Sequence, residues 1–524
     1  MKTIEIYDTT LRDGAQTEGI LFSLQDKLRI ARKIDELGIH YIEGGMPGAN
    51  PKDTEFFRAV RRWKRRSAEI AAFGATCRPH TKPESDPVIQ TLLKSHPDVI
   101  TIVGKSWDLH VRMVLGTTEK ENLRMIRDTI AFLTGSGYRV FFDAEHFFDG
   151  CESNMRYALE TVCAAVEGGA ERVVLCDTNG GMLPGEVREI VVAVRNTIKI
   201  PLGIHTHNDG GLAVANTIAA VEAGVVQVQG TINGYGERCG NADLCALLPN
   251  LVLKMNLPAI GKNKLRKLSS VAHFVSEVAN MPHPWSSPYT GNSAFAHKSG
   301  IHVNAVRKEP RTYEHIAPSL VGNMRRLLVS EQSGKSNVLH IAEQMGIHLK
   351  DKQVVQSVLR QLKELEFDGY QFEGAEGSFE ILLRKNIGRH KRFFELQGFR
   401  VVVDKRRGRE IFSEATIRIK VADHEEMAVA EGDGPVNALD NALRKVLERF
   451  YPSLSEMHLT DYKVRVLDAV HGTAAKVRVL ITSADHATTW STVGVSTNVI
   501  QASWKALVDS IEYKLLKDIE KSDK

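Results

Sequence analysis

The sequence predicts an α/β fold: a TIM (β/α)8 barrel, followed by a mostly helical linker region and a C-terminal α+β domain. Three observations predict it. Eight short apolar, β-branched runs alternate with amphipathic helical stretches over roughly 250 residues, the spacing of a (β/α)8 barrel. Polar residues capable of chemistry gather where these runs end. Near residue 391 the pattern changes to sets of alternating strands, each leading into a helix.

Each barrel unit has its own strand and helix signal. Strands are predicted at 3–7, 41–45, 69–73, 99–103, 139–143, 172–176, 202–207 and 226–231. Helices are predicted at 24–37, 53–65, 120–133, 153–167, 185–196 and 212–223. The main rival is a doubly wound open sheet. Eight near-even units, and the absence of a GxGxxG run after the first strand, favour a closed barrel.

The polar residues follow the strands in order. They are Asp8, Arg12 and Asp13 after the first strand, Glu43 in the second, Glu145 after the fifth, Asp177 and Thr178 after the sixth, His205 and His207 in the seventh, and 233–241 after the eighth. Barrel enzymes build their active sites at the carboxyl ends of the strands. The sequence therefore predicts one site at that face.

Composition shifts divide the chain into three predicted domains, 1–280, 281–390 and 391–524. The segment 281–288 (MPHPWSSP) holds three prolines, which cannot continue a helix. The middle part is mostly helical, most clearly at 352–365, and a basic run at 405–409 predicts a turn. In the last part, strands at 415–421 and 426–430 precede a helix at 436–450. Strands at 462–469, 474–481 and 488–493 precede a helix at 498–516, a weak internal duplication.

Composition excludes several classes of protein. The chain has 524 residues, 43% of them hydrophobic, and a net charge of +4 from 68 basic and 64 acidic side chains. A nucleic-acid-binding surface needs a clustered basic excess, so no nucleic-acid partner is expected. The six cysteines form no CxxC pair and none follows Cys245, which favours reduced thiols and a cytoplasmic location. No secretory signal and no run of 18 apolar residues is present, so no membrane partner is expected.

The strand containing His205-Thr-His207 predicts a metal site. A two-residue spacing in a strand points both imidazoles to one face. Two imidazoles with carboxylate and amide oxygens suit a divalent ion such as Zn²⁺, Mn²⁺ or Mg²⁺. Asp13 is the natural carboxylate and Asn241 could complete the set. The alternative is a pair of hydrogen-bonded structural histidines at the barrel rim, which the acidic loop after the first strand disfavours.

The loop Asp8-Thr-Thr-Leu-Arg-Asp-Gly-Ala-Gln16 is dense in polar groups directly after a strand. Arg12 offers a planar fork of donors that could hold a carbonyl oxygen as it becomes an alkoxide. The alternative is a turn in which the arginine and the aspartates neutralise one another. Glu43 could touch a substrate, but a charged residue in a barrel layer is as often a supporting ion pair.

Three motifs carry a resemblance to a known family. DTTLRDGAQ, HTHNDGGLAVAN and NGYGERCGNADL resemble the metal-dependent acyl-CoA condensing enzymes related to isopropylmalate and homocitrate synthases. The opening DTTLRDGAQTEGILFSLQDK, with YIEGGMPGANPKD, most resembles the citramalate synthase branch. The resemblance covers essentially the whole chain, including AHKSGIH and RTYE of the linker and a C-terminal domain of the regulatory, effector-binding type.

The resemblance implies a role for each matching residue. It implies that Asp13, His205 and His207 hold the metal with Asn241 nearby, that Arg12 stabilises the alkoxide, and that Thr178 binds the substrate carboxylate. It also places Glu145 as a catalytic residue near His302 and Tyr313 of the partner subunit in a homodimer. Without the family, Glu145 would be read as a structural ion pair, and His302 and Tyr313 as ordinary core or surface residues.

The implied reaction condenses acetyl-CoA with pyruvate, after which water releases CoA. The implied effector of the C-terminal domain is isoleucine. Asp143 shares its strand face with Glu145, and could shape the pocket and bind substrate. Three alternatives remain open: a sibling synthase acting on 2-oxoisovalerate or 2-oxoglutarate, a lyase or aldolase on the same barrel, and a non-catalytic amino-acid sensor.

Overall fold

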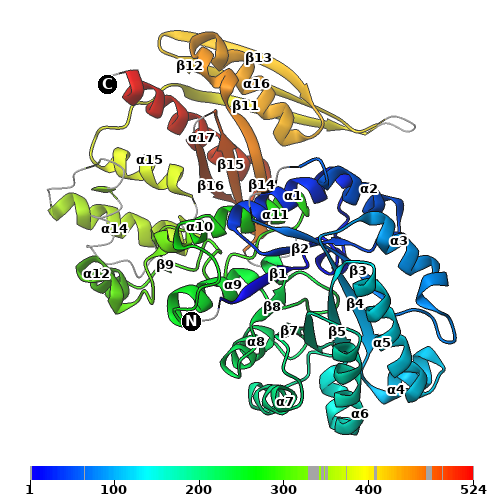
Figure 1. Cartoon of the computed structure of the whole chain (residues 1–524). Coiled ribbons are helices and arrows are strands. Elements are labelled where there is room, and N and C mark those ends of the chain that lie inside the picture. The colour runs from blue at the N-terminus through cyan, green and yellow to red at the C-terminus, as the bar shows by residue number, and fades with distance from the viewer. Residues whose placement is uncertain are drawn as a thin grey trace. The chain divides into compact units, whose positions relative to one another are not determined.

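The computed structural model describes residues 3–63, 65, 67–328, 342–343, 347, 352–372, 375–405, 410–467, 475–486 and 488–522 (Figure 1). The chain forms two compact units. The first comprises Met1–Phe295 with Ile316–Arg325, and the second comprises Ala296–His315 with Arg326–Lys524. In the described part, no helix is both long and apolar enough to cross a bilayer.

The first unit is built on a closed parallel barrel, which confirms the predicted fold class (Figure 1). Its strands, in order around the barrel, are β1 (Glu5–Asp8), β2 (Tyr41–Gly45), β3 (Glu69–Ala75), β4 (Val99–Lys105), β5 (Arg139–Glu145), β6 (Arg172–Asp177), β7 (Leu202–Thr206) and β8 (Gln227–Gly230). The barrel closes where β1 pairs with β8, with Glu5 opposite Gln227.

Helices of the first unit follow the strands. They are α1 (Leu24–Leu37), α2 (Pro51–Val60), α3 (Pro87–Ser95), α4 (Asp108–His110), α5 (Glu119–Gly135), α6 (Phe147–Glu167), α7 (Pro184–Thr197), α8 (Ala213–Glu222), α9 (Leu244–Pro249), α10 (Lys262–Leu265) and α11 (Leu268–Val278). Local sequence fixes their ends. Ser23 and Asp26 form a capping box at the start of α1, and Gly38 ends that helix in the left-handed region with φ 89°.

Short turns of helix complete the connections. They are the 3-10 turns η1 (Gly14–Gln16), η2 (Pro83–Ser85), η4 (Ile232–Gly234) and η7 (Pro318–Val321), and the π turns η3 (Val111–Leu115) and η5 (Asn250–Lys254).

Side chains alternate between two environments along β5. On β5, Phe142 and Ala144 belong to the apolar layer between strands and helices. Phe141 packs in a small cluster with side chains of β1 to β4, and Asp143 and Glu145 line a pocket. This alternation confirms that Asp143 and Glu145 share one face of the strand, with the polar residues nearest its carboxyl end.

The second unit contains the linker elements and two β-β-β-α repeats. The linker elements are β9 (Ala296–His297), α12 (Gly300–Lys308), η6 (Pro310–Thr312), β10 (Arg326–Leu327), α14 (Lys352–Phe367) and α15 (Glu376–Asn386). The repeats are β11 (Glu395–Asp404), β12 (Phe412–Val421), β13 (His424–Gly432) and α16 (Pro435–Phe450), then η8 (Pro452–Glu456), β14 (His458–Val466), β15 (Val477–Ala484), β16 (Thr489–Ser496) and α17 (Val499–Ser522). Each repeat has a three-stranded antiparallel sheet, and both contribute to one buried cluster that includes Ile417, Leu443 and Trp504.

The structure corrects several predicted boundaries. Helix α2 ends at Val60 rather than at 65, and β4 and β5 extend two residues further because Lys105 and Glu145 continue the strand pairing. The prediction missed β11, whose residues are all half-buried or exposed, so no apolar alternation marks it. Some predicted positions lie outside the described residues. They are 64, 406–409, 468–469 and 474, and, within the predicted helical region 281–390, residues 329–341, 344–346, 348–351 and 373–374.

Candidate active site

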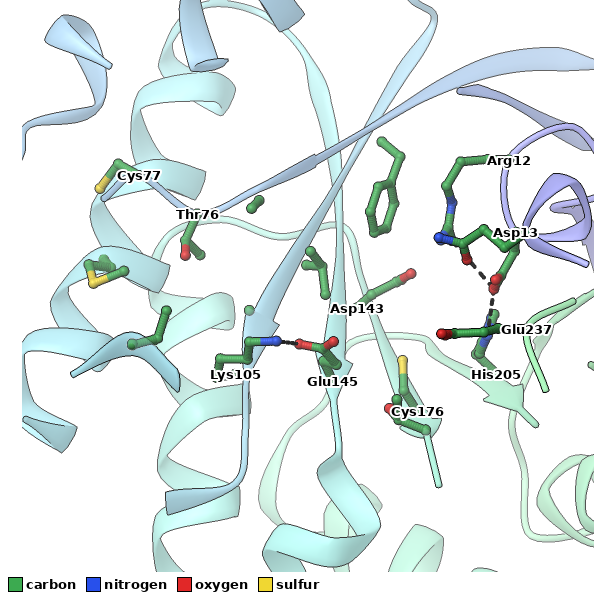
Figure 2. Close-up of a pocket in the computed structure, with 18 of the residues that line it drawn as sticks. Arg12, Asp13, Thr76, Cys77, Lys105, Asp143, Glu145, Cys176, His205 and Glu237 are labelled. Carbon is green, nitrogen blue, oxygen red and sulfur yellow. Dashed lines mark hydrogen bonds and ion pairs between the residues drawn. The ribbon is translucent and has the colours of Figure 1, made fainter. Parts of the chain in front are cut away.

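A cavity of about 470 Å³ opens at the carboxyl ends of the barrel strands (Figure 2). The predicted site residues that line it are Arg12, Asp13, Asp143, Glu145, Thr178, His205 and His207. They come from strand ends and loops of β1, β5, β6 and β7. The structure thus brings these residues of the first unit to one place, at the face where barrel enzymes carry their sites.

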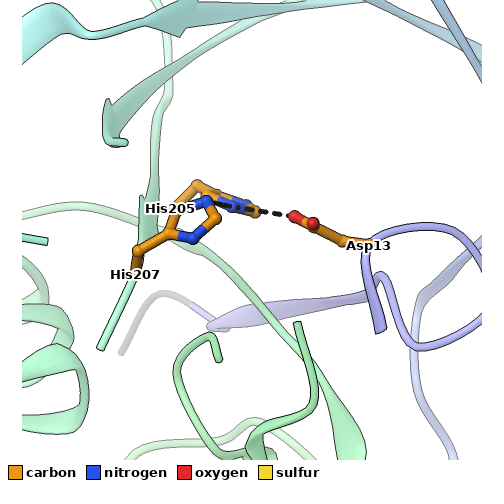
Figure 3. A group of neighbouring side chains, drawn as sticks. All are labelled: Asp13, His205 and His207. Atoms are coloured by element: carbon orange, nitrogen blue, oxygen red, sulfur yellow. Dashed lines mark hydrogen bonds and ion pairs between the residues drawn. The ribbon is translucent and has the colours of Figure 1, made fainter. Parts of the chain in front are cut away.

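Asp13, His205 and His207 form a compact, buried cluster (Figure 3). The Oδ2 atom of Asp13 lies 3.3 Å from Nε2 of His205, which lies 3.3 Å from Nε2 of His207. One ligand atom from each residue falls within 4.8 Å of the others. Two imidazole nitrogens and a carboxylate oxygen converging on one point are a donor set for a divalent cation.

Asn241 lies against this cluster. Its Nδ2 donates to Oδ2 of Asp13 at 2.8 Å and lies 3.4 Å from Nε2 of His205. Two buried polar atoms here, Oδ1 of Asn241 and Nδ1 of His207, have no hydrogen-bond partner. A Cβ at Gly236 would come within 2.2 Å of that Oδ1, so only glycine leaves the room. Because buried polar groups are normally paired, this orphaned oxygen beside converging ligands fits a metal site.

Gln229, which was not predicted from the sequence, orients His205. The Nε2 of Gln229 donates to Oδ1 of Asp143 at 3.1 Å, so its Oε1 accepts from Nδ1 of His205 at 2.9 Å. A proton on Nδ1 leaves the lone pair on Nε2, which faces Asp13 and His207. Outer hydrogen-bond partners of this kind fix the tautomer of a ligating histidine. The polar residue on the inward face of the eighth strand was the available signal.

Electrostatics set the protonation of the three residues of the cluster. Burial lowers the pKa of His205, but the hydrogen bond and charge of Asp13 outweigh it and raise that pKa, so a cation competes with a proton at this imidazole. Burial alone would raise the pKa of Asp13, but Arg12 and His205 outweigh it and hold that pKa below its usual range. Burial and the neighbouring His205 lower the pKa of His207 to about 3. Asp13 is therefore charged and His207 neutral near pH 7, the protonation states that metal ligands need.

Arg12 is held in place by a carboxylate and a ring. Its Nε donates to Oε1 of Glu43 at 2.5 Å, and Tyr7 donates to Oε2 of the same carboxylate at 2.8 Å. The guanidinium lies 3.8 Å from the centre of the Phe73 ring. Burial lowers the pKa of Arg12, but Glu43 and Asp13 raise it further, so it stays charged. Glu43 thus acts as the supporting ion pair.

Asp143 lies between the two sides of the pocket in Figure 2. Its side chain is buried, and burial followed by the charge of Glu43 raises its pKa to about 7. Asp143 therefore carries its proton for part of the time at neutral pH, unlike an exposed carboxyl group.

Glu145 is the last residue of β5 and forms an ion pair with Lys105, the last residue of β4 (Figure 2). The two residues are register partners in the β4–β5 pairing. Both line the pocket. Lys105 was not predicted as a site residue, although a polar residue at the end of the fourth strand was a visible signal.

Thr178 has its hydroxyl at the pocket wall. Its Oγ1 accepts the backbone N–H of His146 at 2.8 Å, which leaves the hydroxyl proton able to donate. Its carbonyl accepts Nη2 of Arg238 at 2.6 Å, and Arg238 also pairs with Asp209. Glu237, which also lines the pocket, was not assigned a role from the sequence.

His302 and Tyr313 belong to the second unit, on α12 and directly after η6. Their ring centres lie 4.1 Å apart, and both side chains are exposed. The structure therefore brings these two residues together on one surface of that unit.

Three family profiles match consecutive parts of the chain. The HMGL-like profile matches residues 3–275, the homocitrate synthase post-HMGL domain-like profile matches 289–369, and the LeuA allosteric (dimerisation) domain profile matches 373–515. The HMGL-like profile covers just over half of the chain. The matched part is the closed parallel barrel that carries the buried Asp-His-His cluster, so fold, site and profile define the same class of protein. The chain is a member of the HMGL-like family.

Relatives that match nearly the whole chain show which branch of the family it belongs to. The chain is 54% identical over 522 residues to the (R)-citramalate synthase of Geobacter sulfurreducens, with 99% of both chains covered. It is 52% identical to the (R)-citramalate synthase of Aquifex aeolicus, covering 99% of this chain and 98% of that one. It is 53% identical to the (R)-citramalate synthase of Synechocystis sp., in an alignment that covers 97% of this chain and 96% of that one. Within the HMGL-like family, the chain belongs with the (R)-citramalate synthases.

Proposed function

We propose that this site condenses acetyl-CoA with pyruvate and water to give (R)-citramalate and CoA, a step of isoleucine biosynthesis. The observation that carries the proposal is the pocket itself. The cluster of Asp13, His205 and His207 and the Lys105–Glu145 pair line the same cavity. One side suits a polarised ketone, and the other suits removal of a proton from carbon. End-to-end similarity to (R)-citramalate synthases supports the same reaction.

The metal side of the pocket would bind the 2-oxoacid. Asp13, His205 and His207, with Asn241 beside them, would hold a divalent cation, Mn²⁺, Mg²⁺ or Zn²⁺. When bound, that cation supplies Lewis-acid polarisation of the ketone. Arg12, fixed by Glu43, donates to the ketone oxygen as it becomes an alkoxide, and the hydroxyl of Thr178 donates to the substrate carboxylate.

The other side would activate acetyl-CoA. Glu145 removes a proton from the methyl group, and the resulting carbon nucleophile attacks the ketone carbon of pyruvate. His302 and Tyr313 of the second unit join this step from the partner subunit of a homodimer. Water then cleaves the thioester and releases CoA. Asp143 limits the room beside the ketone's side chain and so contributes to the choice of pyruvate.

Regulation is assigned to the C-terminal part. We infer three functional domains, a catalytic barrel at 1–280, a linker at 281–390 and an effector-binding domain at 391–524. Isoleucine, the end product of the route, is the proposed effector, and it would lower activity through the linker. The match to a LeuA allosteric (dimerisation) domain supports both this role and a homodimer.

The test is thiol release from acetyl-CoA with Mn²⁺ or Mg²⁺, offering pyruvate, 2-oxoisovalerate, 2-oxoglutarate and 2-oxobutyrate separately. The highest kcat/KM with pyruvate is the expected result. A preference for a larger acid would make the chain a 2-isopropylmalate or homocitrate synthase. No release with any acid would favour a lyase or an amino-acid sensor. Isoleucine that neither inhibits the enzyme nor shifts its Tm would contradict the proposed effector.

A further inference from the structure

Lys105 occupies a position that no assigned role explains. It is the last residue of β4, opposite Glu145 in the register, and its ammonium pairs with the Glu145 carboxylate inside the pocket. Its side chain is 21% exposed and that of Glu145 is 26% exposed, so both groups are open to a ligand entering the cavity. A single, partly exposed ion pair contributes little stability, which makes a purely structural role a weak explanation.

Hydrogen bonds fix the backbone of Lys105 and Glu145. The carbonyl of Lys105 accepts Nδ2 of Asn122 at 2.8 Å, and Asn122 is fully buried. The N–H of the next residue, Ser106, donates to the carbonyl of Glu145 at 3.0 Å. The ends of β4 and β5 are therefore fixed side by side, so the Lys105 ammonium and the Glu145 carboxylate lie next to each other in the cavity.

Of the basic side chains near this part of the pocket, Lys105 is the charged one that pairs with Glu145. His110 is close, but burial, His146 and Lys105 itself lower its pKa, so His110 is neutral at pH 7. Arg12 is bound to Glu43 and Asp13 on the metal side. Among the described residues, Glu145 forms an ion pair with Lys105.

We propose that Lys105 is a catalytic residue that stabilises the enolate oxygen of acetyl-CoA, an inference that rests on the proposed function. Glu145 takes the methyl proton as the C–H bond breaks. The C–H electron pair forms the carbon–carbon double bond, and the carbonyl π pair moves onto the thioester oxygen. That oxygen accepts a hydrogen bond from the ammonium. An ammonium group has three donors, so Lys105 can hold Glu145 and the thioester oxygen together.

The chemistry explains why a cation belongs beside the base. A thioester methyl group is only weakly acidic, and donors aimed at the developing oxyanion are the usual means of lowering this barrier. The charge of Lys105 lies next to the atom that accepts the proton, so it faces the site where negative charge appears. After proton transfer, the neutral Glu145 leaves the ammonium free to pair with the enolate alone.

The test uses the full-length protein with saturating Mn²⁺ and three variants, Lys105→Met, Lys105→Arg and Lys94→Met. Lys94 is an exposed lysine on α3, outside the pocket, and serves as the matched control. The first readout is deuterium entry into the acetyl-CoA methyl group in D₂O. It is measured with oxamate, a pyruvate analogue that does not condense. The second is kcat and KM for acetyl-CoA and pyruvate.

Lys105→Met is expected to slow methyl exchange and kcat by about 10²–10³-fold, the cost of losing one oxyanion donor. The KM for pyruvate should stay within about threefold, because pyruvate binds on the metal side. Lys105→Arg should recover at least about tenfold of the loss, since it keeps a charged donor. Lys94→Met should match the wild type. Tm and Mn²⁺ affinity confirm folding, and Lys105→Gln replaces Lys105→Met if the latter does not fold.

The outcomes separate this inference from the proposed function. Lys105→Met exchanging and turning over at the wild-type rate would overturn the role of Lys105 while leaving the condensation intact. Wild-type exchange that depends on Lys105, without pyruvate-dependent thiol release, would overturn the proposed reaction and keep the role of Lys105. A wild-type protein that shows neither exchange nor release would overturn both.

Discussion

The two sides of the pocket are built differently. On the metal side, Asp13, His205 and Gln229 belong to a buried network that ties β1 to β5, β7 and β8. On the other side, Lys105 and Glu145 form one ion pair at the ends of two neighbouring strands, and each is partly exposed. The first side is therefore organised before any ligand binds, whereas the second is open to a large acyl-CoA. Changes to each side should therefore have different consequences.

The largest effect is expected from removing a cluster residue on the metal side. His205→Ala deletes one of two imidazoles and breaks the contacts to Asp13 and Gln229. Mn²⁺ affinity should fall by more than about 100-fold, the upper end of what losing an outer partner of a ligand costs. Condensation should fall with it. Calorimetric titration with Mn²⁺ measures the affinity, and the exposed His458→Gln provides the control. Unchanged affinity would show that the cluster is not a metal site.

Removing the base should affect rate alone. Glu145→Gln keeps the size of the side chain but cannot accept the methyl proton, so kcat is expected to fall by about 10²–10⁴-fold. Mn²⁺ affinity should not change, because Glu145 contacts no member of the cluster in the described hydrogen bonds and ion pairs. Thiol release and metal titration of the same preparation check both expectations. A matching loss of Mn²⁺ affinity would mean that the two sides are not separate.

Two glutamines on β8 separate an orienting role from simple burial on the metal side. Gln229 and Gln227 both lie on β8 and both are fully buried, but Gln229 orients His205 whereas neither polar atom of the Gln227 side chain has a partner. Gln229→Leu should weaken Mn²⁺ binding by about 10–100-fold. Gln227→Leu should leave the affinity unchanged. Metal titrations of the two variants measure the difference directly, and equal affinities would contradict an orienting role for Gln229.

The sequence predicted the metal side better than the other. The HTH spacing and the acidic loop after the first strand were enough to group Asp13 with both histidines, because strand parity and barrel topology follow from local patterns. Lys105 and Gln229 were not predicted. Their roles depend on which residues face each other across neighbouring strands, and this register comes from the closed barrel rather than from either segment alone.

The same distinction holds for the fold. Barrel strands with buried apolar faces were found, whereas β11 was not. Strand β11 lacks fully buried residues and is stabilised by antiparallel pairing with β12, a contact between segments that no pattern within β11 reveals. His302 and Tyr313 were grouped only through the family resemblance, since neither lies in a periodic apolar pattern that would have marked it.

The smallest expected effect concerns Asp143, the carboxyl group that joins the two sides. Burial, and then Glu43, raises its pKa to about 7, and Gln229, Arg12 and His205 also face it. An aspartate in the unfolded chain titrates near pH 4. Below that pH the carboxyl group is protonated in both the folded and the unfolded protein, and above about pH 8 it is charged in both. Between these limits the folded protein holds a proton on Asp143 that the unfolded chain has lost. The free energy of unfolding therefore falls as pH rises through this window.

Asp143→Asn removes this titration and keeps an oxygen that accepts from Gln229. Without added divalent metal, the Tm of the variant relative to the wild type should therefore rise between pH 4 and about 7.5, by on the order of 3–5 °C, and stay level above pH 8. Thermal unfolding at several pH values measures it, with the exposed Asp461→Asn on β14 as the control. A Tm difference independent of pH would mean that Asp143 is charged throughout.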